Sequence, residues 1–119
     1  MGRTRAPRRL TVGGQVWLWN VGHTHPGCRT YLTLRRVEAR HSALRLVFRG
    51  GPGRIVAGFP MGVGEVAAAH GGHLNLHEPG VVRRFLDLAA AHGLLPVAHG
   101  AREVDGWPLF DALTEAGRG

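Results

Sequence analysis

Residues 30–48 read TYLTLRRVEARHSALRLVF and contain two short runs rich in leucine, β-branched and aromatic side chains. The first run covers residues 30–39, the second covers residues 42–48, and only Arg40 and His41 separate them. A connection this short joins antiparallel strands, because a crossover between parallel strands needs about a dozen residues or more. The stretch therefore predicts two neighbouring strands of an antiparallel sheet.

The segments on both sides of this stretch continue the pattern. Toward the N-terminus, two β-prone runs are joined by Gly13-Gly14, a pair typical of the two-residue turn that requires positive φ. Toward the C-terminus, the glycine-rich turn at 50–53 leads into a further β-prone run. We therefore predict an antiparallel meander over residues 9–59.

The clearest helix is predicted at residues 79–92. Pro79 suits the first helical turn, where its missing N–H is not needed, and apolar side chains then recur at helical spacing. These side chains are Val82, Phe85, Leu86 and Ala89. Gly93 follows at the position where a helix commonly ends in a left-handed residue. A shorter helix is predicted to begin at Pro108, near the C-terminus.

Several other segments carry weaker signals. Residues 65–70, EVAAAH, predict one or two helical turns that end at a glycine pair. Residues 97–104 predict either a loop or an edge strand. At the two ends of the chain, residues 1–8 predict a disordered basic lead and residues 117–119 predict a frayed tail.

This order of elements, strands first and helices later, predicts the α+β class. The expected architecture is a two-layer sandwich, with the antiparallel sheet of residues 9–59 in one layer. The main helix at 79–92 and the short C-terminal helix then cover one face of that sheet. The length of 119 residues fits one domain, which we expect to span residues 9–116.

The alternation of side chains along a strand assigns residues to the two faces of the predicted sheet. The predicted core face holds Val16, Leu18, Leu32, Leu34, Leu44, Leu46 and Phe48. The opposite face then holds Gln15, Trp17, Trp19, Tyr31, Thr33, Arg35, Arg45 and Val47. An alternative for the first hairpin places both tryptophans in the core and Leu18 outside.

The cationic residues are distributed unevenly along the chain, whose formal net charge is +7. All fifteen are arginines, and eleven of them lie in residues 1–54 together with a single acid, Glu38. Residues 55–119 hold four arginines and seven acids. A first half this basic favours an acidic partner, and the alternative is that the two halves neutralise each other within one fold.

Composition also excludes some classes of protein. No run approaches the ~18 uncharged apolar residues that a membrane-spanning helix needs. The single cysteine, Cys28, excludes an internal disulfide and agrees with a reducing compartment. We therefore expect a cytoplasmic protein that has no membrane partner.

The mixture of aromatic and arginine side chains on the second face predicts a binding surface. Such residues are favoured at protein interfaces, so the leading hypothesis is a non-catalytic module that binds a protein partner or a second copy of itself. The alternative partner is single-stranded nucleic acid, whose bases stack on aromatic rings while arginines hold the phosphates. In both cases the predicted contact residues are Trp17, Trp19, Tyr31, Arg35 and Arg45. Nucleic acid would be held in addition by Arg3, Arg5, Arg8 and Arg9.

A further alternative is a metal site in the predicted loop at 22–29, which holds His23, His25 and Cys28. Two imidazoles and a thiol suit zinc or another transition metal. A structural zinc site needs four ligands, and the chain has no second cysteine. The fourth ligand would therefore come from His70, His73 or His77.

The motifs of common catalytic sites do not occur in the sequence. GxSxG, HExxH and GxxxxGK[ST] are all absent. Gly62-x-Gly64 lacks the third glycine and the preceding strand of a dinucleotide-binding turn. We therefore expect no enzymatic activity and no cofactor, the metal alternative aside.

Overall fold

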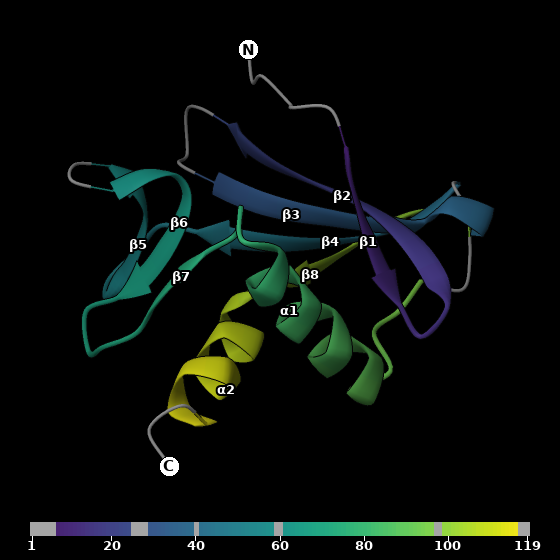
Figure 1. Ribbon diagram of the computed structural model, residues 1–119. Coiled ribbons are helices and arrows are strands. Elements are labelled where there is room, and N and C mark those ends of the chain that lie inside the picture. Colours follow the sequence, from purple (N-terminus) through teal and green to yellow (C-terminus); the bar gives the residue numbers. More distant parts are fainter. Residues whose placement is uncertain (1–6, 25–28, 40, 59–60, 97–98, 117–119) are drawn as a thin grey trace.

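Two sheets and two α-helices make up the part of the chain that the computed structural model describes (Figure 1). The described residues are 7–24, 29–39, 41–58, 61–96 and 99–116, with the backbone alone described at 57–58, 61–63 and 115–116. The predicted α+β class is confirmed. The predictions for the two ends lie outside the described residues, except that Arg8, which we assigned to the disordered lead, is the first residue of a strand.

The larger sheet has five strands in the order β1-β2-β3-β4-β8. Their bounds are β1 Arg8–Val12, β2 Gln15–Thr24, β3 Arg29–Arg36, β4 Ser42–Arg49 and β8 Gly100–Asp105. The first four strands form the predicted antiparallel meander, and a 3-10 turn, η1 Val37–Ala39, follows β3. β8 pairs with β4 in parallel at one edge of the sheet, which confirms the edge-strand alternative for this part of the chain.

The meander ends at β4, because the next strand belongs to a separate sheet. β5 Arg54–Gly58, β6 Met61–Ala68 and β7 His73–Asn75 form this three-stranded antiparallel sheet, at the left of Figure 1. The prediction of helical turns at 65–70 is wrong, since residues 65–68 belong to β6. Val66 pairs with both neighbouring strands and is fully buried, and this packing outweighs the helical preference of the alanines that follow it.

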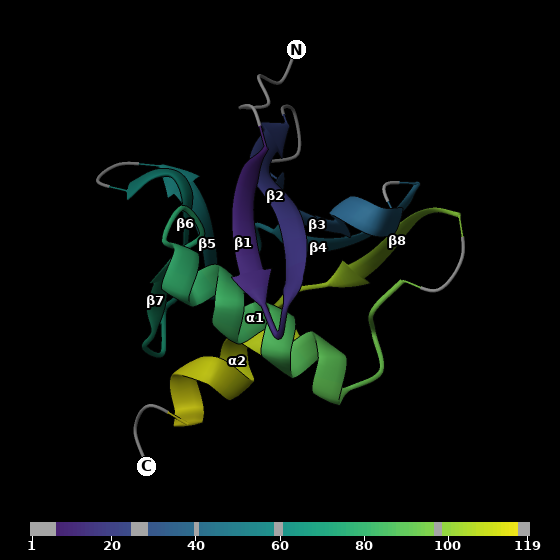
Figure 2. The ribbon, with the colours of Figure 1, turned by 45° about the vertical axis from the view of Figure 1, so that its right-hand side comes forward.

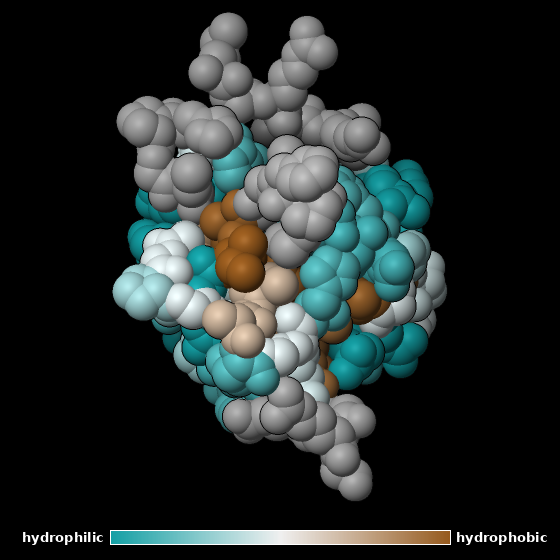
Figure 3. Space-filling model, turned by 90° about the vertical axis from the view of Figure 1, so that its left-hand side faces the viewer, coloured by the Kyte–Doolittle hydropathy of each residue, from teal (hydrophilic) through white to brown (hydrophobic). Residues whose placement is uncertain are grey.

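The outer side of the second sheet has one large exposed hydrophobic side chain among the described residues. Ile55 of β5 is the large hydrophobic side chain described as exposed, at 45%. Figure 3 shows this side of the molecule, where the brown hydrophobic surface is a small area among hydrophilic and grey atoms. A single exposed side chain of this kind is ordinary for a monomeric protein.

The two helices have the positions predicted for them. α1 Pro79–Ala91 ends one residue before the predicted bound, and Gly93 takes a φ of 70° just beyond it. α2 Trp107–Ala116 is the short C-terminal helix. Both helices lie on the same side of the larger sheet (Figure 2), and their apolar residues form one core with it.

Phe48 of β4 joins the two helices to the sheet. Its ring centroid lies 5.7 Å from that of Phe85 in α1 and 5.3 Å from that of Trp107 in α2, both in edge-to-face geometry. All three rings are buried, Phe48 and Phe85 completely. Edge-to-face pairs add about 0.5–1.5 kcal/mol each to the free energy of burial.

The predicted faces of β2 are reversed in the structure. Trp17 and Trp19 face the core, where they are 4% and 1% exposed, whereas Leu18 is only partly buried and faces away. Trp19 pairs with Leu34 across β2 and β3, so the tryptophans share the face of the buried leucines. The prediction that Val16 and Leu18 form the core is therefore wrong, and the alternative for this hairpin is confirmed.

The reversal follows from the area that each choice buries. An indole side chain buries about 150–250 Å², more than a leucine does. β2 also continues to Thr24, so that the side of the tryptophans gains Val21, while the other side gains Asn20 and Gly22. The other predicted core positions of the meander are confirmed as buried, namely Leu32, Leu34, Leu44, Leu46 and Phe48.

Candidate functional site

We use the term open face for the face of the larger sheet that points away from α1 and α2. Strand register places on it alternate residues of β2, β3, β4 and β8. They include Leu18, Asn20, Gly22, Thr24, Arg29, Tyr31, Thr33, Arg35, Arg45, Val47 and Glu103. Tyr31, Arg35 and Arg45 are therefore brought together as predicted, whereas Trp17 and Trp19 lie on the opposite face.

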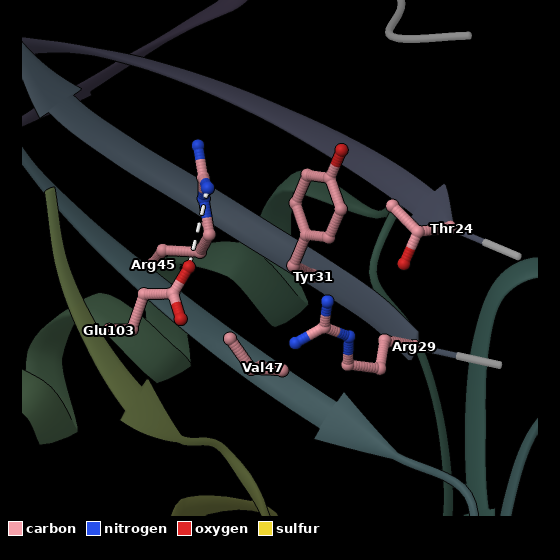
Figure 4. A pocket seen from close by; sticks show the side chains of 6 residues that line it. All are labelled: Thr24, Arg29, Tyr31, Arg45, Val47 and Glu103. Atoms are coloured by element: carbon pink, nitrogen blue, oxygen red, sulfur yellow. Dashed lines mark hydrogen bonds and ion pairs between the residues drawn. The ribbon is translucent and has the colours of Figure 1, made fainter. Parts of the chain in front are cut away.

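A shallow pocket of about 120 Å³ lies in the open face (Figure 4). Its walls come from Thr24, Arg29, Tyr31, Arg45, Val47 and Glu103. Figure 4 shows these side chains on the near side of the four strands, with helices behind the sheet. Two guanidinium groups, one phenol ring and one carboxylate therefore surround the same small volume.

Tyr31 forms the central wall of this pocket, and Gly22 makes room for it. The two residues are directly opposite across β2 and β3, and the ring of Tyr31 occupies the space that a Cβ at position 22 would need. A side chain there would push the ring off the sheet. The glycine therefore holds the tyrosine flat against the strands, an arrangement known to stabilise glycine positions in sheets.

Arg45 lies beside this ring and is oriented by two polar contacts. Its guanidinium carbon is 5.0 Å from the centroid of the Tyr31 ring. Its Nε donates to the Thr33 hydroxyl at 3.3 Å, and its Nη1 lies 3.4 Å from Oε2 of Glu103 in β8. The ion pair is half-exposed and adds little stability, but it places one carboxylate at the rim of the pocket.

Arg29 is the second cation of the pocket, and its guanidinium forms no hydrogen bond or ion pair with another described residue. Across the strands, the hydroxyl oxygen of Thr24 is buried and has no hydrogen-bond partner among the described residues. Buried hydroxyl groups in folded proteins are nearly always hydrogen-bonded. The pocket therefore offers an unused planar donor group and an unsatisfied hydroxyl side by side.

The sequence analysis missed Arg29, Thr24 and Glu103 as members of the site. Arg29 could have been found, because it shares the two-residue period of Tyr31 and Arg35 along β3. Glu103 could not, because its position depends on the parallel pairing of β8 with β4, to which no local pattern points.

The predicted metal ligands are only partly within the described residues. His23 lies at the end of β2, where its Nδ1 is 2.8 Å from the hydroxyl of the buried Thr30. His25 and Cys28 lie outside the described residues. His73, one of the proposed fourth ligands, contacts Oε1 of Glu65 at 2.8 Å. No group of three or more potential ligands occurs within the described part of the chain, so the loop site stays a prediction.

The predicted nucleic-acid contacts are reduced by the burial of the tryptophans. Of the N-terminal arginines proposed to hold phosphates, Arg3 and Arg5 lie outside the described residues. Arg8 contacts the core instead, because its guanidinium carbon is 4.6 Å from the Trp19 ring centroid and its Nη1 donates to the carbonyl of His77 at 2.8 Å. Tyr31 is then the predicted stacking ring that remains on the open face.

No protein-family description, curated protein or solved structure matches the chain. Within the described residues, neither helix is long and apolar enough to cross a membrane. The functional argument therefore rests on the geometry of the open face.

Proposed function

We propose that the chain is a non-catalytic binding module that engages an acidic protein partner through its open face. The observation that supports this proposal most directly is the gathering of Arg29, Tyr31, Arg35 and Arg45 on the side of the sheet that the helices leave uncovered. Arginine and tyrosine are enriched in protein interfaces and contribute much of their binding energy. A positive surface of this kind also steers an acidic partner toward it.

A second copy of the chain is a weaker candidate for the partner. Each copy carries a net charge of +7, so two copies repel each other. Several acids that could meet the arginines of another copy already have partners within the chain. These pairs are Arg54–Asp111, Arg83–Asp87 and His73–Glu65. Among the described residues, Ile55 is the large exposed hydrophobic side chain, which is little apolar surface for a contact between two copies.

Single-stranded nucleic acid is also a weaker candidate. Stacking contributes about 1–3 kcal/mol per base, and the burial of Trp17 and Trp19 removes two of the three rings that were predicted to supply it. The remaining ring, Tyr31, is packed beside Arg45.

The test compares a charge reversal on the open face with a matched reversal elsewhere. Affinity capture from an extract of the source organism is carried out with wild type, with Arg35→Glu/Arg45→Glu, and with Arg83→Glu/Arg84→Glu on α1. We expect wild type and the α1 variant to retain an acidic protein, and the open-face variant to recover about ten-fold less of it. Circular dichroism shows that all three proteins are folded.

Two results would contradict the proposal. Equal recovery of the partner by both double variants would show that the open face is not the contact surface. Capture that disappears on nuclease treatment would instead support nucleic acid, and a binding constant that falls with salt by about −0.7 per phosphate contact on logarithmic axes would identify a single strand.

A further inference from the structure

We propose, resting on the function proposed above, that the pocket around Arg29 holds one carboxylate side chain of the acidic partner. Arg29 supplies the first reason, because no described residue pairs with its guanidinium. The planar fork of a guanidinium donates two parallel hydrogen bonds that match the two oxygens of a carboxylate. In Figure 4 this group points toward the space between Tyr31 and Val47.

The Thr24 hydroxyl supplies the second reason. Thr24 lines the same pocket, and its hydroxyl oxygen is buried without a hydrogen-bond partner among the described residues. Leaving a buried polar group unsatisfied costs about 1–3 kcal/mol. A carboxylate held by Arg29 would lie next to Thr24, and rotation of this side chain about χ1 would let its hydroxyl donate to the carboxylate. Binding would therefore satisfy a group that the free protein leaves unpaired.

The walls of the pocket define the size of the group that it accepts. Val47, directly opposite Tyr31 across β3 and β4, is only 4% exposed and forms an apolar floor. The Tyr31 ring closes one side. A volume of about 120 Å³ admits a small planar group at the end of a side chain. The carboxylate end of an aspartate or glutamate side chain from a partner segment has this size and shape.

The charge of the pocket distinguishes a carboxylate from a phosphate monoester. Arg29 and Arg45 bring two positive charges and Glu103 brings one negative charge, which leaves a single positive charge. A carboxylate carries one negative charge, whereas a phosphoryl group carries about −1.5 to −2 at neutral pH. Glu103 would repel the more highly charged group more strongly. The pocket is thus complementary to a monoanion.

The experiment uses an acetylated hexaglutamate peptide as the probe. Binding to the full chain is followed at low salt by the NMR shifts of backbone amides and of arginine Nε–H groups. The variants are Arg29→Lys, which keeps the charge but loses the planar fork, and Thr24→Val, which keeps the shape but loses the hydroxyl. Arg102→Lys is the control, because Arg102 pairs with Leu44 and lies on the other face of the sheet.

We expect Arg29→Lys to weaken binding of the peptide about ten-fold and Thr24→Val to weaken it several-fold. The control variant should bind like wild type. The shifts of wild type should be largest at Arg29 and Tyr31. This result would assign the carboxylate to the pocket.

Three outcomes would overturn the inference. Unchanged affinity in Arg29→Lys would mean that the peptide responds to charge alone, and the proposed function would then stand without this pocket. Tighter binding of a phosphoserine peptide of equal net charge, lost in Arg29→Lys, would assign the pocket to phosphate. If the NMR signals of the pocket residues do not shift at millimolar peptide concentrations, the pocket does not bind a carboxylate. The capture experiment judges the proposed function separately from all three.

Discussion

At the residue scale, Trp19 is among the largest fully buried side chains of the core. Its side chain is 1% exposed, Arg8 lies over its ring, and it pairs with Leu34 of the neighbouring strand. Its indole N–H is buried without a hydrogen-bond partner in the described part of the chain, so packing rather than hydrogen bonding holds the side chain in place. Its neighbour Leu18 lies on the open face and is only partly buried.

We predict that Trp19→Ala lowers the free energy of unfolding by about 3–5 kcal/mol, because it leaves a cavity in the core. Leu18→Ala should lower it by about 1 kcal/mol or less, since a partly exposed side chain leaves no closed cavity. Urea unfolding of both variants measures the difference. A larger loss for Leu18→Ala than for Trp19→Ala would restore the face assignment that the sequence favoured.

A correct prediction of the faces of Leu18 and Trp19 requires knowing where β2 ends. Over residues 15–19 the alternation gives two equally apolar faces, one with Val16 and Leu18 and one with both tryptophans. Extending the strand through Val21 breaks this balance, because Val21 shares the side of the tryptophans. Likewise, β3 begins at Arg29, one residue before the predicted run, and this earlier start would have added Arg29 to the predicted contact residues.

Arg54 and Asp111 link the second sheet to α2 at the element scale. Nη1 and Nη2 of Arg54 donate to the two carboxylate oxygens of Asp111 at 2.7 and 2.8 Å. The guanidinium carbon of Arg54 also lies 4.6 Å from the ring centroid of Trp107, at the start of α2. The hydrogen bonds from Arg54 hold the pKa of Asp111 below its ordinary value.

This pair predicts a pH-dependent contribution to stability. A carboxyl group whose pKa is lower in the folded state stabilises the fold above its unfolded-state pKa of about 3.9, and the contribution is lost as the pH falls through the folded value. Asp111→Asn should therefore lower the free energy of unfolding by about 1 kcal/mol at pH 7, with the difference shrinking at pH 3. Urea titrations at the two pH values measure it.

Asp87→Asn is the control for this experiment. Asp87 forms an exposed pair with Arg83 one helical turn away, which typically contributes about 0.3–0.5 kcal/mol. It should therefore lower stability by less than Asp111→Asn does. An Asp111→Asn effect that is the same at both pH values would show that the ion pair is not its source.

The elements with strong local signals were predictable, and those fixed by distant pairing were not. The proline, apolar stripe and glycine of α1 predicted its bounds to within one residue. β6 carries a run of alanines with helical preference, and it is a strand because β5 and β7 pair with it on both sides. Tertiary pairing of this kind overrides local propensity.

The charge of the whole molecule predicts its behaviour in solution. With a net charge of +7 and little exposed apolar surface among the described residues, we expect the chain alone to sediment as a monomer. Sedimentation velocity over a range of concentrations, at low and physiological salt, measures the state. If wild type forms a stable dimer and the Arg35→Glu/Arg45→Glu variant does not, the open face binds a second copy of the chain and not an acidic partner.

The parallel pairing of β8 with β4 has a consequence for the order of folding. The second sheet and α1 lie between these strands in the chain, so β8 is the last strand of the larger sheet to emerge during synthesis. Until it docks, the edge of β4 is unpaired next to Leu44 and Leu46, and an open edge of this kind templates aggregation. A chain cut short before β8 would also lack Glu103 and the rim that it forms. Docking of β8 replaces the open edge of β4 with one that carries Arg102, Glu103 and Asp105, and charged edge strands resist self-pairing. The same late strand thus completes the binding pocket.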